Sequence, residues 1–368
     1  MKVRPWPIVT AALLVGASLS VFLLSLAEGP TDIYEVTTMD VRYDVVVTNA
    51  GPGDAEMIPL TVAFVRDIEP NQHVLRTTVS PSPSRNFTDA LNNSFASFTI
   101  DRLGAGQNFT FTFTATVELK GMDFNLKPRS AGTYRGEEDA FLAPTGLADS
   151  NHPAVQAKAR ELQDPAGDLF QTAWNIYTYI VDQVAYQQLA GEWPASWVIT
   201  HGEGGSAEFG NVFVALARAS GIPARRLSGW GETFNVSETR TANRLAHGWA
   251  EFYFPAFGWV PVDPTWGKVN RFDNFGRPDE RHVVMTRGEG IHFFARGAYS
   301  SPSGDASVTT DYRVTPLQIR SETVSAEHFI VLGFMYGLPL FFLAVVAHKV
   351  QVQRREAGRA GRGDNEGG

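Results

Sequence analysis

The sequence has no cysteine among its 368 residues. Disulfide bridges, thiolate metal sites and a cysteine nucleophile are therefore excluded. The sequence also lacks a strong excess of either charge, because the formal net charge is only −8 and no basic stripe crosses the central region. We therefore expect no nucleic-acid partner, since surfaces that bind nucleic acid gather Lys and Arg on one face.

Metal and cofactor motifs are missing too. The sequence contains no HExxH-type pair, and its central histidines are scattered: His152, His201, His247, His282 and His292. This spacing predicts no metal centre. The Gly-rich stretch GEGG at 202–205 lacks the Lys-Ser/Thr of a phosphate loop, and no dinucleotide fingerprint context precedes it. We expect no small-molecule cofactor.

Two long apolar runs predict transmembrane helices. The first covers 7–27 without a charge and follows Lys2 and Arg4. About 20 such residues span a bilayer, whereas a signal-peptide core has roughly 7–15, so a retained anchor is favoured over a cleaved signal peptide. The second run covers 329–347 and precedes a basic tail, 348–368, that is predicted to be disordered.

The positive flanks predict the topology of these two runs. Both flanks lie on the chain-end side, so both termini are expected to be cytoplasmic and the central domains extracytoplasmic in a two-pass cell-membrane protein. Four glycosylation sequons are compatible with this location: Asn86, Asn92, Asn108 and Asn235. Gly333 and Gly337 form a GxxxG pair, which either allows a second helix to pack closely in a dimer or is incidental spacing.

The region 31–125 has the pattern of an antiparallel β-sandwich. Short runs alternate apolar and polar residues with turn signals between them. In NFTFTFTATVEL, for example, Phe109, Phe111 and Phe113 share one face and the threonines the other. Nothing in this region points to chemistry, and we interpret it as a spacer or adhesive module.

The pattern changes in the region 140–320. Helical spacing of apolar residues predicts helices near Pro153, over 168–187, and from Ser206 to a C-terminal cap at Gly221. Alternating runs after residue 244 predict antiparallel strands. The predicted fold class is therefore α+β, with the β-sandwich first and both domains flanked by two transmembrane helices.

Three side chains of this second domain could act together. Ser206 opens a predicted helix, His247 opens a strand, and Asp263 closes the next strand sixteen residues later. Neighbouring antiparallel strands would place the imidazole beside the carboxylate, and nucleophile, base and orienting carboxylate form the logic of acyl transfer. Taken singly, Ser206 has the more ordinary interpretation of a helix N-cap and Asp263 that of a turn residue.

The surrounding motifs resemble those of the transglutaminase-like core family. They are Gly-Ile-Pro-Ala-Arg at 221–225, His-x-Trp-x-Glu at 247–251, and Gly-Trp-x-x-x-Asp-Pro-Thr at 258–265. The resemblance covers about 140–295 and implies a papain-like fold. It implies that His247 is the base and Asp263 its orienting group. Family members use a cysteine to attack a glutamine side-chain amide or a peptide bond, and that cysteine position corresponds to Ser206.

The serine at this position leaves three hypotheses open. One is a degenerate site that binds peptide or protein amides outside the cytoplasm. The second is an active Ser-His-Asp acyl-transferase or peptide hydrolase, whose oxyanion hole would use the Ser206 backbone N–H and a second donor, for which Trp197 is the candidate. The third is a structural protein of an envelope or surface assembly.

Overall fold

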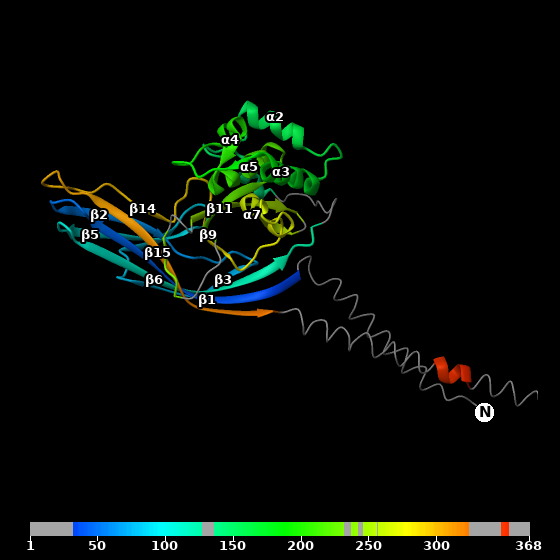
Figure 1. The fold of residues 1–368 in the computed structure, drawn as a ribbon, viewed down its shortest axis with the longest axis horizontal. Helices are drawn as coiled ribbons and strands as arrows, with labels where there is room; N and C mark the ends of the chain where they lie inside the picture. Colours follow the sequence, from blue (N-terminus) through cyan, green and yellow to red (C-terminus); the bar gives the residue numbers. More distant parts are fainter. Residues whose placement is uncertain are drawn as a thin grey trace, which may run out of the picture. The chain divides into compact units, whose positions relative to one another are not determined.

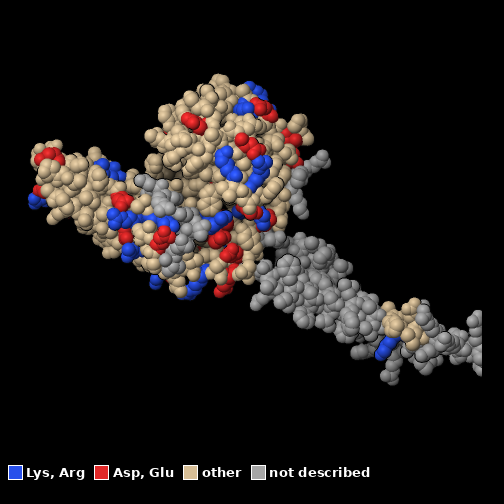
Figure 2. Space-filling view, viewed as in Figure 1, with Lys and Arg blue, Asp and Glu red and all other residues tan. Residues whose placement is uncertain are grey.

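A computed structural model describes most of the central chain. It covers 32–126, 136–231, 237–241, 246–255, 257–323 and 347–352. Residues 30–322 form one compact unit, in which a β-sandwich is continuous with a layer of helices on a second sheet (Figure 1). On the face shown in Figure 2, basic and acidic side chains are interspersed over both parts.

The predicted membrane spans fall almost wholly beyond these stretches. The run 7–27 and residues 329–346 of the second run lie outside the described residues. Within the described stretches, no helix combines the length and the apolar character needed to span a membrane. Residues 347–352 are helical, so the first part of the tail predicted to be disordered is ordered. The predicted dimer contact at Gly333 and Gly337 also lies outside the described residues.

The sandwich consists of two antiparallel sheets. One has the order β10-β15-β1-β6-β3 and the other β14-β2-β5-β4. The strands are β1 Asp32–Asn49, β2 Ala55–Ala63, β3 Gln72–Ser80, β4 Arg85–Thr88, β5 Ser94–Leu103, β6 Asn108–Asp123, β10 Arg240–Thr241, β14 Phe294–Arg296 and β15 Val308–Thr323. The sandwich predicted over 31–125 is present, and three of the four sequon asparagines are exposed on it, whereas Asn235 lies outside the described residues.

The predicted domain boundary needs a correction. Residues 294–320 were placed with the second domain, but β14 pairs with β2, and β15 lies beside β1 in the sandwich. The chain therefore returns to its first domain after completing the second. Alternation of side chains predicted a strand at β15 but not at β14, and it carries no information on which sheet a strand joins.

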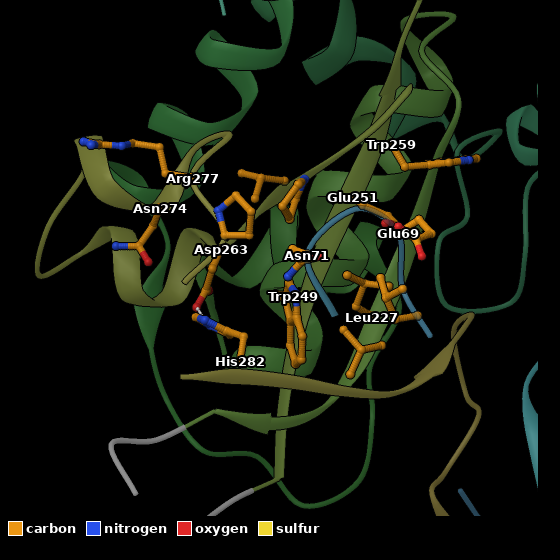
Figure 3. A pocket seen from close by; sticks show the side chains of 15 residues that line it. Glu69, Asn71, Leu227, Trp249, Glu251, Trp259, Asp263, Asn274, Arg277 and His282 are labelled. Atoms are coloured by element: carbon orange, nitrogen blue, oxygen red, sulfur yellow. Dashed lines mark hydrogen bonds and ion pairs between the residues drawn. The ribbon is translucent and has the colours of Figure 1, made fainter. Parts of the chain in front are cut away.

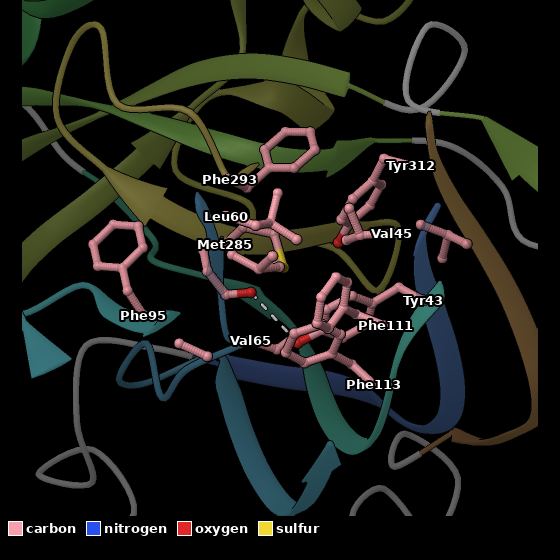
Figure 4. Packing of buried hydrophobic residues seen from close by; sticks show 14 of the residues in the cluster. Tyr43, Val45, Leu60, Val65, Phe95, Phe111, Phe113, Met285, Phe293 and Tyr312 are labelled. Carbon is pink, nitrogen blue, oxygen red and sulfur yellow. Dashed lines mark hydrogen bonds between the residues drawn. The ribbon is translucent and has the colours of Figure 1, made fainter. Parts of the chain in front are cut away.

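Aromatic rings fill the space between the two sandwich sheets. Tyr43 stacks on Phe113 with ring centroids 4.7 Å apart, and its hydroxyl lies 3.5 Å from the Ala63 carbonyl (Figure 4). Phe111 and Phe113 are buried as the alternation predicts, whereas Phe109 is 38% exposed at the end of the strand. Trp230 contributes to the same core from the second domain, at 5.5 Å from Tyr43.

The second domain packs helices on a four-stranded sheet with the order β12-β11-β9-β13. Helix α5 contacts β11 and β9 of this sheet and also the helices α2, α3 and α4. The larger elements are α2 Pro153–Leu162, α3 Leu169–Gln183, α4 Ala195–His201, α5 Ser206–Ala219, β9 Ala224–Gly231, β11 Ala246–Phe254, β12 Gly258–Val262 and β13 His282–Arg287. Short segments complete it: η1 Glu137–Leu142, β7 Ala185–Tyr186, β8 Glu203–Gly204, α7 Pro264–Gly267 and η2 Phe272–Asn274.

Local signals explain where these helices begin and end. The Asp168 carboxylate caps α3 by accepting from the Phe170 and Gln171 amides at 2.9 and 3.3 Å. Gly221 follows α5 with φ of 78°, a left-handed conformation that glycine adopts without strain, as predicted for the end of this helix. Helix α4 was not predicted, because its seven residues are too few to show helical periodicity.

The shared core generates a stability prediction. Trp230 is fully buried between the sandwich and the second sheet. We expect Trp230→Ala to lower the free energy of unfolding by about 3–5 kcal/mol, because it leaves a cavity in the core that joins the two domains. The matched control is Trp193→Ala, whose side chain is 39% exposed and which should cost about 1 kcal/mol. Chemical denaturation monitored by tyrosine and tryptophan fluorescence measures both. If Trp230→Ala lowered the free energy of unfolding no more than Trp193→Ala does, the shared core would be contradicted.

Candidate active site

Ser206 is the first residue of α5 and is not its cap. Gly205 occupies the N-cap position, and its amide donates to the carboxylate of Glu208 at 2.9 Å. Glu208 is buried, and it also accepts from the Trp193 amide at 3.1 Å. A carboxylate at this end satisfies amides that the helix leaves free and complements the helix dipole. The cap interpretation of Ser206 is therefore wrong, and its side chain is available for another role.

The Ser206 hydroxyl faces strand β11. Its oxygen accepts a hydrogen bond from the Gly248 amide at 3.3 Å. This approach needs glycine at 248, because a Cβ there would lie 2.8 Å from the Ala207 Cα. The helix start thus rests directly on the strand residue that follows His247. The structure brings the predicted nucleophile and base onto facing elements.

His247 and Asp263 form the predicted pair. Strands β11 and β12 pair antiparallel, with Phe254 opposite Gly258 and a short connection between them, which brings the two side chains together. The His247 Nε2 lies 2.8 Å from Asp263 Oδ2. The other carboxylate oxygen accepts from the Thr265 and Trp266 amides at 2.8 and 3.3 Å, so Asp263 also caps the short helix α7.

The imidazole of His247 is closely packed. A Cβ at Gly231 would lie 2.6 Å from its Cδ2, so the neighbouring strand leaves room for the ring only because residue 231 is glycine. The rings of Trp249 and Trp266 each lie 5.6 Å from it. His247 is 8% exposed and Asp263 is 3% exposed, so the pair meets almost no bulk solvent.

A second histidine, which the sequence analysis did not select, completes this cluster. His282 Nε2 lies 3.1 Å from Asp263 Oδ2, and its Nδ1 lies 2.6 Å from Asp279 Oδ1. Figure 3 shows His282 and Asp263 pointing toward each other beside Trp249. The sequence did contain a signal, because Asp279 precedes His282 by three residues at the start of a strand.

The charges in this cluster support one another. Burial alone would lower the pKa of His282, but Asp279 and Asp263 raise it to about 9 by charge and hydrogen bonds. Burial alone would raise the pKa of Asp263, yet His247 and His282 hold it well below its usual range. In the same way His282 and Arg281 lower the pKa of Asp279 to about 2. At neutral pH an imidazolium therefore lies between two carboxylates.

The cluster also has donor types that bind metals. The ligand atoms of His247, Asp263 and His282 lie within 4.8 Å of one another, an arrangement that the sequence did not predict. A metal-bound imidazole must offer an unprotonated nitrogen. Both nitrogens of His282 face carboxylates, and each carboxylate stabilises the proton on the nitrogen that it contacts. The residues present therefore fit a cluster joined by hydrogen bonds between imidazoles and carboxylates better than a metal centre.

A pocket of about 270 Å³ opens at Ser206 and His247. Its walls come from the loop 188–192, from the start of α5, and from the segment that returns to the sandwich, and they include Gln188, Glu192, Arg226, Ser228, Ile291, His292 and Phe293. Arg226 binds the Glu192 carboxylate through two nitrogens at 2.9 and 3.2 Å. The pocket therefore combines apolar walls with hydrogen-bonding groups, as ligand sites do.

The predicted oxyanion donor Trp197 does not line this pocket. It lies in α4, stacks on His201 at 4.0 Å and on Trp193 at 4.8 Å, and its amide donates to Pro194. The sequence analysis did not predict helix α4, which places Trp197 outside the lining of the pocket. Gln188 lines the pocket instead, with its amide oxygen 3.8 Å from where a Cβ on Gly205 would lie.

Other residues of the sequence motifs stabilise the sheet behind the site. Arg225 lies 2.5 Å from the Glu251 carboxylate, with its guanidinium 3.7 Å from the centre of the Trp259 ring. Arg287 makes a second ion pair with Glu251 at 3.0 Å. A buried carboxylate requires such partners, so these motif residues fix the strands that carry His247 and His282.

The charge on His282 predicts a pH dependence of stability. Its pKa is raised from 6.5 to about 9 in the folded state, so its contribution is complete below pH 6.5 and is lost as pH rises through 9. We expect His282→Gln to cost about 1–3 kcal/mol at pH 6 and less at pH 10. His73→Gln, which removes an exposed histidine 3.0 Å from Asp67, is the control. Urea denaturation at each pH measures the difference, and a cost independent of pH would contradict it.

Comparisons with known proteins agree with this geometry. Residues 156–264 match the model of the transglutaminase-like superfamily. The chain is 30% identical over 178 residues to the uncharacterized protein YebA of Bacillus subtilis, covering 44% of this chain and 24% of YebA. It is 38% identical over 90 residues to an uncharacterized Haemophilus influenzae protein, covering 20% of this chain and 24% of that one. The chain thus spans about a quarter of the length of these relatives.

A solved structure shares the fold beyond this domain. The Cytophaga hutchinsonii protein named "Putative Cysteine Protease" is 18% identical, with a TM-score of 0.55 over 80% of this chain and 93% of that chain. At this identity the likeness concerns the fold alone. Together with the match of the family model and the arrangement of α5, β11 and β12, it leads to one conclusion. The chain contains a domain of the transglutaminase-like superfamily at 156–264, with a papain-like fold.

Proposed function

We propose that this chain is a membrane-anchored, extracytoplasmic protein that binds peptide or protein amides in the pocket at Ser206 and His247. In this proposal the site is degenerate in catalysis, because Ser206 stands where the family has its cysteine. The transglutaminase-like domain supports the class of ligand. The apolar runs 7–27 and 329–347 support the anchoring.

One observation, the hydrogen bonding of Ser206, supports a site that is degenerate in catalysis. The Ser206 oxygen accepts a hydrogen bond from the Gly248 amide, and the contacts described for Ser206 include no hydrogen bond with His247. A serine becomes nucleophilic when a base within hydrogen-bond reach takes its proton. A cysteine at a helix N-terminus beside a histidine can instead be ionised beforehand, with a pKa lowered to about 3.5–7.5, so its attack does not depend on proton removal in the same step. The arrangement therefore suits a thiol better than a hydroxyl.

The pocket suits an extended peptide. Ile291 and Phe293 offer apolar surface, and Glu192 and Gln188 offer an acceptor and an amide. Backbone amides in the first turn of α5 can donate to a carbonyl oxygen at Ser206. A peptide amide needs both a donor and an acceptor when it leaves water, and these walls supply both.

The alternative function is an active acyl-transferase or hydrolase, favoured by the 2.8 Å contact between His247 and Asp263. In that reaction Ser206 Oγ attacks the amide carbonyl carbon and His247 takes its proton. The leaving amine takes that proton as the C–N bond breaks, and water or another amine then releases the acyl group. The Ser206 amide and Gln188 would stabilise the oxyanion.

An envelope-assembly role remains the third proposal, which binding of another envelope protein outside this pocket would support.

Active-site labelling separates the degenerate site from the active one. We expect a fluorophosphonate to leave the full chain in detergent unlabelled, as judged by intact mass. We expect Ser206→Cys to react with iodoacetamide at pH 6 at least about tenfold faster than free cysteine, because this position favours a thiolate.

The controls are Ser206→Ala and His247→Ala. The sequence has no cysteine, so the thiol introduced at 206 is the only one that can react. Stoichiometric fluorophosphonate labelling of the wild-type protein that both alanine variants abolish would overturn the degenerate site and establish an activated serine.

The cysteine-free sequence also allows a direct test of topology. We expect Ser84→Cys, on an exposed position of the sandwich, to react with a membrane-impermeant maleimide in intact cells. Ala360→Cys, in the predicted cytoplasmic tail, should react only after the membrane is permeabilised. Labelling of both positions in intact cells, or of neither, would contradict the proposed two-pass topology.

A further inference from the structure

The buried polar chain at the site extends beyond the pair of His247 and Asp263. It runs from the pocket through His247, Asp263 and His282 to Asp279, with successive contacts of 2.8, 3.1 and 2.6 Å. All four side chains are nearly buried, at 8%, 3%, 8% and 6% exposure. Isolated buried charges are costly, so a chain of this kind persists only where each member has its partner.

Asp279 anchors the far end of this chain. Its Oδ1 accepts from the Arg281 amide at 3.0 Å and its Oδ2 from Arg281 Nε at 2.7 Å. The Arg281 guanidinium lies over the Trp266 ring at 4.7 Å. Asp279 is therefore fixed by the backbone and by a packed arginine, and it holds His282 in one orientation.

Asp263 is the member with the most partners. One oxygen lies against the two imidazole nitrogens, and the other accepts two backbone amides of α7. A carboxylate has about four acceptor positions, so all of them are used. The pocket at Ser206 is lined by His247 and not by His282, so the second imidazole holds Asp263 from outside the pocket.

We propose that His282, as an imidazolium held by Asp279, is a positioning residue for the Ser206 site. It keeps Asp263 ionised and oriented, and through Asp263 it fixes the ring of His247 toward the pocket. It does not touch a ligand, since it lies behind Asp263. This inference concerns the site of the proposed function, but it requires no bound peptide.

The positive charge of His282 also separates two carboxylates. Asp263 and Asp279 lie against opposite nitrogens of the same ring. If a neutral side chain replaced the imidazolium, two buried carboxylates would face each other, and ionisation of one would disfavour ionisation of the other. Asp263 would then take up a proton at higher pH and release His247. The other charged groups near Asp279 are Arg281, Glu280, Arg277, Asp273 and Glu35, with the Tyr34 hydroxyl.

The experiment uses Ser206→Cys in the full chain in detergent, where the introduced thiol is the only one present. The rate of its alkylation by iodoacetamide is measured from pH 4 to 9, alone and with His282→Gln. A third protein combines His282→Gln with Asp279→Asn, which removes the second carboxylate. The matched control adds His73→Gln, a histidine that also contacts an aspartate but is exposed on the sandwich.

We expect His282→Gln to move the acid midpoint of the alkylation profile upward by about one pH unit or more. Adding Asp279→Asn should recover at least half of that shift, and His73→Gln should produce none. A merely structural His282 would lower the melting temperature and leave the midpoint unchanged. An unchanged midpoint in a folded His282→Gln protein overturns the inference, as does a double variant shifted as far as the single one.

A second measurement holds even where the variants fail to fold. Histidine-selective ¹⁵N NMR of the wild-type chain at pH 7 should show His282 with both nitrogens protonated. A neutral ring with one protonated nitrogen overturns the inference. Neither readout involves a ligand, so a failure of peptide binding would count against the proposed function and leave this result standing.

Discussion

The carboxylate of Asp263 is the interaction on which the site depends. It accepts from two imidazoles and two backbone amides, and these donors come from β11, β13 and α7. Elements distant in sequence are therefore tied together at one buried charge. Because every acceptor position is used, His247 keeps one orientation without a bound ligand, and the pocket is formed in advance.

The sandwich contributes to this arrangement through its core. Trp230 of β9 and Met285 of β13 belong to the apolar cluster of the sandwich, although their strands form the sheet behind the site. Figure 4 shows Met285 among the residues of this cluster. The Gln72 side chain also makes two hydrogen bonds with the backbone of Val284: its oxygen accepts from the amide at 2.8 Å, and its nitrogen donates to the carbonyl at 2.9 Å. The strand that begins at His282 is thus fixed by the sandwich. The sandwich therefore supports the site, a role that a spacer or adhesive module would not have.

Much of this could be predicted from the sequence, for physical reasons. Alternation predicted the longer sandwich strands β1, β2, β5, β6 and β15. Motif spacing predicted that β11 and β12 would bring His247 to Asp263, because a short connection fixes their register. The partner sheet of β15 could not be predicted, since pairing across distant segments leaves no local pattern. The contact of His282 with Asp263 could not be predicted for the same reason, because it arises only when β13 pairs with β9. Trp197 does not line the pocket, because it lies in α4, a helix that was not predicted.

Isothermal titration of an extended glutamine-containing peptide into the full chain tests the account most directly. The wild-type protein and Ser206→Ala should bind it with Kd values within about threefold of each other, because a degenerate serine contributes little to binding. Mass spectrometry should find the peptide unchanged after prolonged incubation. Absence of binding by a folded protein, or turnover that disappears in Ser206→Ala, would contradict the account.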